Sequence, residues 1–145
     1  MGLISPATSS LTRSDPFRRD TNIVSELAKP APNSNEMRWM SGLSSVAISA
    51  ITLEEVSFGL ASRPNTRVER FLEGFIDTFC RVHEITAAIA LHAGILRGQL
   101  GRRGRVRSQT DMLIAATASA HGLGLVTRNE RDFDRCGVAV HNPFK

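Results

Sequence analysis

The stretch TDMLIAATASAHGLGLVTRNERDF, residues 110–133, contains the pattern that decides the fold. Its first half is rich in alanine and other apolar residues and ends at Gly122, which predicts a helix. The next residues, LGLVT (123–127), form a short apolar run typical of a buried strand, and the polar residues 128–135 predict a turn. A helix that leads through a short turn into a buried strand is typical of α/β folds.

The same alternation continues on both sides of this stretch. Apolar runs predict further strands at 45–50, 79–85 and 137–144. Apolar spacing of three and four residues predicts helices at 21–29, 33–42, 52–63, 65–78 and 86–100. Residues 1–19 are rich in Ser, Thr, Pro and Arg, and we expect an irregular leader there. Residues 20–145 are expected to form one α/β domain with a mostly parallel central sheet flanked by helices.

Composition and charge narrow the classes of function. Of the 145 residues, 41% are hydrophobic and 22% charged, and no apolar run is long enough to cross a bilayer. The first residues show no secretory signal pattern, so we expect a cytoplasmic protein with no membrane partner. The two cysteines lack metal-ligand spacing and predict neither a zinc site nor a disulfide framework. The net charge is +4 and all but two of the 18 basic residues are arginine, which favours nucleic acid as a partner.

Acidic residues stand where the predicted strands end. Glu55 lies early in the helix after 45–50, Asp111 opens the alanine-rich helix, and Asp132 follows the strand 123–127. Asp20 is a fourth candidate if a strand precedes it. The carboxyl ends of parallel strands meet at one edge of a sheet, so we expect these carboxylates to converge.

Clustered carboxylates repel one another unless a cation neutralises them, so this set predicts a metal. Oxygen ligands without clustered His or Cys favour Mg²⁺ or Mn²⁺. Beside a basic surface, such a site suits metal-assisted hydrolysis of a phosphodiester.

Each acid also has a purely structural interpretation. Thr52 with Glu55, and Ser108 with Asp111, match the capping-box pattern of a helix start. Asp132, with Asp134 close by, can be a solvated turn residue. The expected position at strand ends is what favours the functional interpretation.

Four segments together resemble a known family. They are DTNIVSEL (20–27), ISAITLEEVSFGL (48–60), the opening stretch (110–133) and VAVHNPF (138–144), and from first to last they span essentially the whole chain from Asp20 onward. Their residues and order resemble PIN-domain ribonucleases, specifically the VapC toxins of type II toxin–antitoxin pairs, with the FitB branch close by.

The resemblance implies a site and its partners. A metal-binding quartet falls on Asp20, Glu55, Asp111 and Asp132, although some members carry the fourth acid where Asn129 stands. Thr127 and Asn129 then orient ligands or water. The family also implies dependence on Mg²⁺ or Mn²⁺, an RNA substrate that is often tRNA, a homodimer, and a cognate VapB-like antitoxin that blocks the site.

A basic loop, GRRGRVR (101–107), precedes Asp111. We expect its arginines to follow RNA phosphates, although a solvated loop has the same composition. The candidate RNA-binding residues are Arg97, Arg102, Arg103 and Arg105.

The residues before Asp20 depart from the family pattern. Members carry an apolar first strand there, whereas this chain has SDPFRRDTN (14–22). Pro16 cannot donate to a strand ladder, and Arg18 and Arg19 are costly in a central strand. We therefore expect the first strand to be atypical or missing, with Asp20 the least secure ligand.

Two functions stay open. The first is a metal-dependent endoribonuclease toxin of the VapBC type. The alternative is a catalytically degenerate PIN domain that binds antitoxin or RNA without efficient cleavage. A phospho-receiver domain is disfavoured because it needs a lysine after a late strand, and only Lys29 and Lys145 exist. A P-loop is excluded because no GxxxxGK[ST] motif occurs.

Overall fold

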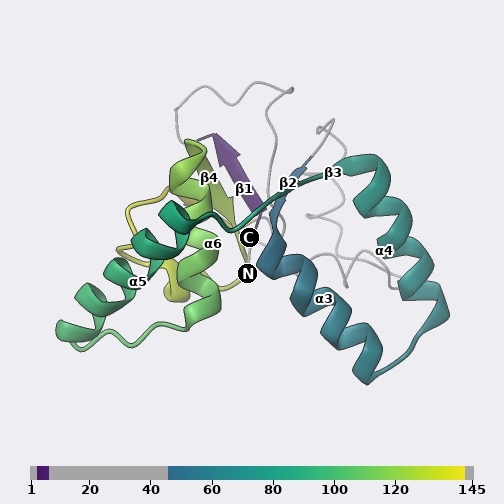
Figure 1. Cartoon of the computed structure of the whole chain (residues 1–145), viewed down its shortest axis with the longest axis horizontal. Coiled ribbons are helices and arrows are strands. Elements are labelled where there is room, and N and C mark those ends of the chain that lie inside the picture. Colours follow the sequence, from purple (N-terminus) through teal and green to yellow (C-terminus); the bar gives the residue numbers. More distant parts are fainter. Residues whose placement is uncertain (1–2, 7–45, 143–145) are drawn as a thin grey trace.

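The computed structural model describes residues 3–6 and 46–142, which form a five-stranded sheet with helices on both faces (Figure 1). The strands are β1 (Leu3–Pro6), β2 (Val46–Ser49), β3 (Cys80–His83), β4 (Leu123–Val126) and β5 (Val140–His141). The helices are α3 (Ala50–Ser62), α4 (Thr66–Phe79), α5 (Ala87–Arg102), α6 (Gln109–Ala120) and the 3₁₀ helix η1 (Glu130–Phe133). The helices expected at 21–29 and 33–42 lie outside the described residues.

The sheet has the strand order β3-β2-β1-β4-β5 and is mixed. The outer pairs, β2 with β3 and β4 with β5, are parallel as expected. Strand β1 is antiparallel to both of its neighbours, with Leu3 opposite Val126 and Ile4 opposite Ala47. The carboxyl end of β1 therefore lies at the opposite edge of the sheet from the carboxyl ends of β2 and β4.

Strand β1 also lies within residues 1–19, for which the composition predicts an irregular leader. The structure differs from that prediction at Leu3–Pro6. The physical reason is that β2 and β4 both need a ladder partner at the centre of the sheet, and an extended segment with free N–H and C=O groups supplies it. Pro6 stands at the last position of the strand, where a missing N–H is tolerated.

The sheet has a hydrophobic cluster on each face, because side chains alternate between the two faces along each strand. Ala47 and Leu125 pack into the main cluster with α5 and α6, whereas their neighbours Val46 and Val126 pack with Phe75 and Phe79. Successive strand residues point to opposite faces, so α5 and α6 cover one face and α4 covers part of the other. The helix and strand of the opening stretch are thus the centre of the core, because α6 and β4 supply most of its fully buried residues.

Candidate active site

Glu55 is positioned by the turn from β2 into α3. Ser49, the last residue of β2, is the N-cap of α3, and its side chain accepts a hydrogen bond from the Ile51 N–H at 3.2 Å. Thr52 and Glu55 consequently lie inside the helix, so the capping-box interpretation of this pair is wrong. Glu55 is half-buried with Oε1 shielded from solvent, whereas the adjacent Glu54 is exposed. This difference supports Glu55 as the candidate ligand.

Asp111 is positioned by the first turn of α6. The Ser108 side chain caps this helix and accepts a hydrogen bond from the Asp111 N–H at 3.0 Å. The prediction that Ser108 caps this helix is therefore confirmed. The Asp111 side chain lies half-buried at the helix N-terminus. A fixed first turn holds this carboxylate in place.

The segment after β4 positions the remaining polar candidates. Thr127 is fully buried, and its Oγ1 accepts a hydrogen bond from the Asn129 N–H at 3.0 Å. The Asp132 N–H in turn donates to the Asn129 carbonyl at 3.2 Å, which begins η1. The side chains of Asn129 and Asp132 are exposed, so Thr127 shapes the turn that presents both to solvent.

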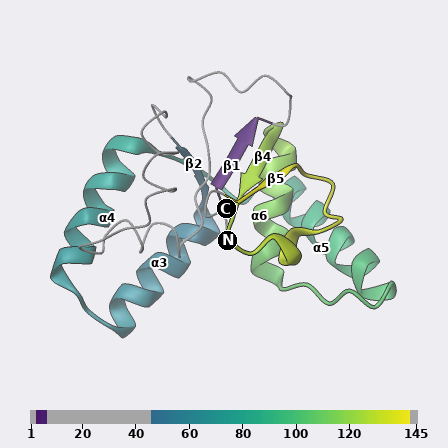
Figure 2. The same ribbon diagram turned by 180° about the vertical axis from the view of Figure 1, so that it is seen from behind.

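The segments that carry these acids meet at one end of the molecule. Helix α6 contacts both α3 and η1. Its N-terminal end lies beside η1, at the edge of the sheet where β2 leads into α3 (Figures 1 and 2). Asp20, the fourth predicted ligand, lies outside the described residues.

The described residues fit a hard cation in their chemistry but do not complete a site for one. The candidate donors are all carboxylate oxygens, as Mg²⁺ or Mn²⁺ prefers. One turn before Glu55, the hydroxyl of Thr52 is buried with no hydrogen-bond partner among the described residues, which suits a place where a ligand completes the polar contacts. No group of three or more His, Cys, Asp or Glu that could hold a metal occurs within the described ranges.

The predicted RNA-binding arginines lie on α5 and on the loop that joins α5 to α6. Arg97 is exposed on α5, and Arg102 and Arg103, at the end of that helix, line a small cavity of about 350 Å³ with Gln99. Arg105 forms an ion pair with Asp134, with Nη1 3.6 Å from Oδ2. The loop after α5 leads directly to the first turn of α6 (Figure 1), so it brings positive charge to Asp111.

Two arginines that the sequence analysis did not single out belong to the same region. Arg107 and Arg131 line a cavity of about 480 Å³ with Arg105, Glu130 and Asp134. Arg107 belongs to the quoted loop 101–107, so its position in the motif was a usable signal. Arg131 carried none, because it stands in a turn whose shape depends on Thr127.

Cys136 lies beside this cavity. Burial raises the pKa of its thiol, and the nearby Arg107 partly offsets that rise. Its Sγ lies 3.8 Å from Met112 Sδ. Arg107 is therefore close to the packed start of α6, the turn that carries Asp111.

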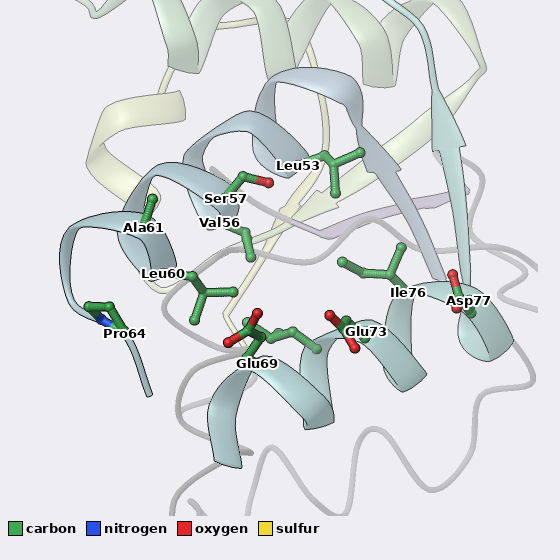
Figure 3. Close-up of a pocket in the computed structure, with 11 residues that line it drawn as sticks. Leu53, Val56, Ser57, Leu60, Ala61, Pro64, Glu69, Glu73, Ile76 and Asp77 are labelled. Carbon is green, nitrogen blue, oxygen red and sulfur yellow. The ribbon is translucent and has the colours of Figure 1, made fainter. Parts of the chain in front are cut away.

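Another cavity, of about 610 Å³, lies elsewhere, between α3 and α4. Its floor is apolar, with Leu53, Val56 and Leu60 from α3 (Figure 3). Three carboxylates of α4 line the opposite wall, those of Glu69, Glu73 and Asp77. Carboxylates repel phosphates, so this cavity is a less suitable site for RNA than the surface that carries the arginines.

No helix in the described ranges is long and apolar enough to span a membrane.

Comparison with known proteins identifies the family. The model of the PIN domain matches residues 19–138. The tRNA(fMet)-specific endonuclease VapC of Shigella flexneri is 36% identical over 122 residues, which are 83% of this chain and 92% of that protein. The toxin FitB of Neisseria gonorrhoeae is 32% identical over 133 residues, 86% of this chain and 96% of that protein.

Solved structures agree with the sequence relatives. A structure of FitAB bound to a DNA fragment superimposes with a TM-score of 0.77 at 30% identity, covering 87% of this chain and 94% of that one. VapBC2 from Rickettsia felis, bound to a DNA fragment from its promoter, gives a TM-score of 0.71 at 27% identity and covers 85% and 95%. The expected PIN fold and the resemblance to VapC and FitB are thereby confirmed, and the chain belongs to the PIN-domain family, among the relatives of VapC and FitB ribonuclease toxins.

Proposed function

We propose that this protein is a metal-dependent endoribonuclease, the toxin of a VapBC-type toxin–antitoxin pair. One observation carries the proposal: the PIN match spans residues 19–138 and includes Glu55, Asp111 and Asp132, on segments that meet at one end of the sheet. The proposed ligands of Mg²⁺ or Mn²⁺ are Asp20, Glu55, Asp111 and Asp132, with Thr127 and Asn129 orienting them. The proposed substrate is RNA, for which the tRNA(fMet)-specific relative makes tRNA the first choice.

Different residues of this chain have different proposed roles in cleavage. A divalent cation at the carboxylates would neutralise charge on the phosphate and lower the pKa of an attacking water. Ser108 holds the first turn of α6, and with it Asp111, in one position. Thr127 fixes the turn that carries Asn129 and Asp132. Arg97, Arg102, Arg103 and Arg105 supply positive charge for the RNA backbone.

The proposed partners come from the same relatives. The similar solved structures are FitAB and VapBC complexes, and one is described as a toxin–antitoxin complex from Klebsiella pneumoniae. We propose an antitoxin partner of the VapB type, a homodimeric toxin, and a cytoplasmic location.

The test is cleavage of a labelled tRNA pool by the purified protein in Mn²⁺, in EDTA, and in Mn²⁺ with the Asp111→Asn variant. We expect cleavage only when both the metal and Asp111 are present. Glu55→Gln and Glu54→Gln form a matched pair, because these adjacent acids differ in burial. Loss of cleavage in Glu55→Gln alone would support the assignment, and equal loss in both would contradict it.

A second candidate, the degenerate PIN domain that binds without efficient cleavage, is favoured by one observation. Strand β1 runs opposite to β2 and β4, so its carboxyl end does not lie at the edge where Glu55 is presented. A folded protein that binds antitoxin but cleaves no RNA in Mn²⁺ would select this candidate.

A further inference from the structure

The cavity beside the start of α6 contains more positive than negative charge. It is lined by three guanidinium groups, those of Arg105, Arg107 and Arg131, and by two carboxylates, those of Glu130 and Asp134. Two residues come from the loop before α6, and the other three come from η1 and the residue directly after it, so the lining combines segments far apart in the sequence. The cavity is therefore a product of the fold and not of one basic run.

The two carboxylates already have partners. Asp134 pairs with Arg105, and Glu130 Oε2 accepts a hydrogen bond from Asn142 Nδ2 at 3.4 Å. These contacts leave Arg107 and Arg131 as the groups whose charge is least neutralised within the cavity.

Arg107 and Arg131 both retain capacity for a ligand. Arg107 Nη2 donates one long hydrogen bond, 3.5 Å, to the Asp134 carbonyl, the guanidinium also interacts with the Cys136 thiol, and its Nε is buried with no hydrogen-bond partner among the described residues. Arg131 is exposed, and no ion pair to it is found within the described ranges. A buried guanidinium N–H without a partner is costly, so a ligand that accepts from it gains that free energy on binding.

The cavity adjoins the proposed catalytic acids without coinciding with them. Arg131 and Asp132 are consecutive in η1, and consecutive side chains of a 3₁₀ helix diverge by about 120°. Arg107 lies beside Cys136, which is also within electrostatic range of Asp111. A group bound in this cavity would therefore lie close to the acids, and it would be a different group from the one that the acids bind.

We propose that Arg107 and Arg131 form a binding site for an RNA backbone phosphate next to the scissile one, and so position the strand for cleavage. This inference rests on the proposed ribonuclease function. Guanidinium groups bind phosphate oxygens in pairs, so two arginines in one cavity suit a backbone phosphate.

Binding is to be measured without cleavage, with the full chain carrying Asp111→Asn, a fluorescent tRNA, EDTA and a series of KCl concentrations. Each phosphate contact to single-stranded RNA contributes about 0.7 to the slope of log affinity against log salt. We expect Arg131→Ala and Arg107→Gln each to reduce the slope by about that amount and to weaken binding at low salt. Arg70→Ala is the matched control, because Arg70 is an exposed arginine on α4.

The outcomes separate this proposal from the proposed function. If the slope falls for Arg131→Ala and not for Arg70→Ala, the phosphate site is supported, even if the wild-type protein cleaves no RNA. An unchanged slope in both cavity variants overturns the site while leaving ribonuclease activity intact. A variant that loses antitoxin binding and keeps its RNA slope overturns it in favour of a protein ligand. Arg131→Ala removes an exposed side chain, so it tests the site even if Arg107→Gln does not fold.

Discussion

At the residue scale, the buried hydroxyl of Thr52 needs a physical explanation. This hydroxyl is buried with no hydrogen-bond partner among the described residues, one turn before Glu55. Leaving a buried hydroxyl unpaired costs free energy, of the order of 1–3 kcal/mol, which a stable fold does not require. The same arrangement recurs at functional sites, where polar groups are kept for a ligand.

We expect Thr52→Val to raise the free energy of unfolding by about 1 kcal/mol and to slow RNA cleavage, because the variant removes an unpaired polar atom near a proposed ligand. Urea unfolding and the tRNA assay measure the two effects. Thr117→Val is the control: Thr117 is equally buried, but its Oγ1 donates to the Leu113 carbonyl at 2.7 Å, so its loss should lower stability. A large loss of stability in Thr52→Val would show that the hydroxyl is satisfied in the folded protein.

The sequence could predict residues whose role depends on local pattern. Ser108 before an alanine-rich helix was recognisable as a cap, whereas the choice of Glu55 over Glu54, made from the family motif, stays a prediction that the lower exposure of Glu55 supports. The cap of α3 was missed because Ser49 also ends a buried strand, so the pattern T-x-x-E three residues later competed with it. Arg131 could not be found, since its place in the cavity follows from tertiary packing of η1 against α6.

At the element scale, the strands and helices after residue 45 were predictable because each has a strong local signal. Helix α4 shows this best, since its apolar residues recur at three- and four-residue steps and Asn65 caps it. Within the described part of the chain, which ends at residue 142, the last strand is Val140–His141, and these are the residues there that pair with β4. Strand β1 was not predictable, because pairing with two distant strands is a non-local property that Leu3–Pro6 does not reveal.

A central β1 makes a definite prediction about Ile4. Its backbone stands opposite Ala47 on one side and Leu125 on the other, so a proline there removes an N–H from the middle of the sheet. We expect Ile4→Pro to lower the free energy of unfolding by about 1–3 kcal/mol, because it leaves a backbone carbonyl of the neighbouring strand without its donor. Ile4→Ala is the control, because it shortens the side chain and keeps the N–H. Equal unfolding midpoints for the two variants in urea would contradict a central position for this strand.

At the scale of the whole molecule, the cavity beside the start of α6 and the cavity between α3 and α4 are lined by charge of opposite net sign. Arginines surround the loop before α6 and η1, whereas Glu69, Glu73 and Asp77 line the groove on α4. A polyanion such as RNA is attracted to the first region and repelled by the second. RNA is therefore expected at the end of the sheet where Asp111 and Asp132 lie, which is the arrangement that the proposed cleavage requires.

The same end of the sheet can be tested as one unit, because a bound ion would link α3, α6 and η1. A ligand at one hundred times its Kd stabilises the folded state by about 2.7 kcal/mol, which for a chain of this size is a rise in Tm of roughly 5–10 °C. We expect Mn²⁺ to raise the Tm of the wild-type protein in this way and to lose the effect in Glu55→Gln and Asp111→Asn. Glu54→Gln should keep it.

The same experiment with Asp20→Asn tests whether Asp20 is a metal ligand. Strand β1 is antiparallel to β2 and β4, so its carboxyl end lies at the opposite edge of the sheet from the proposed ligands Glu55 and Asp111, and a role of Asp20 in metal binding is tested directly by this variant. If Asp20→Asn abolishes the Mn²⁺ shift, the quartet is complete and the ribonuclease has the ligands that its family implies. If the wild-type protein shows no shift at all, the acids do not form a metal site, and the chain is a PIN domain that binds without cutting.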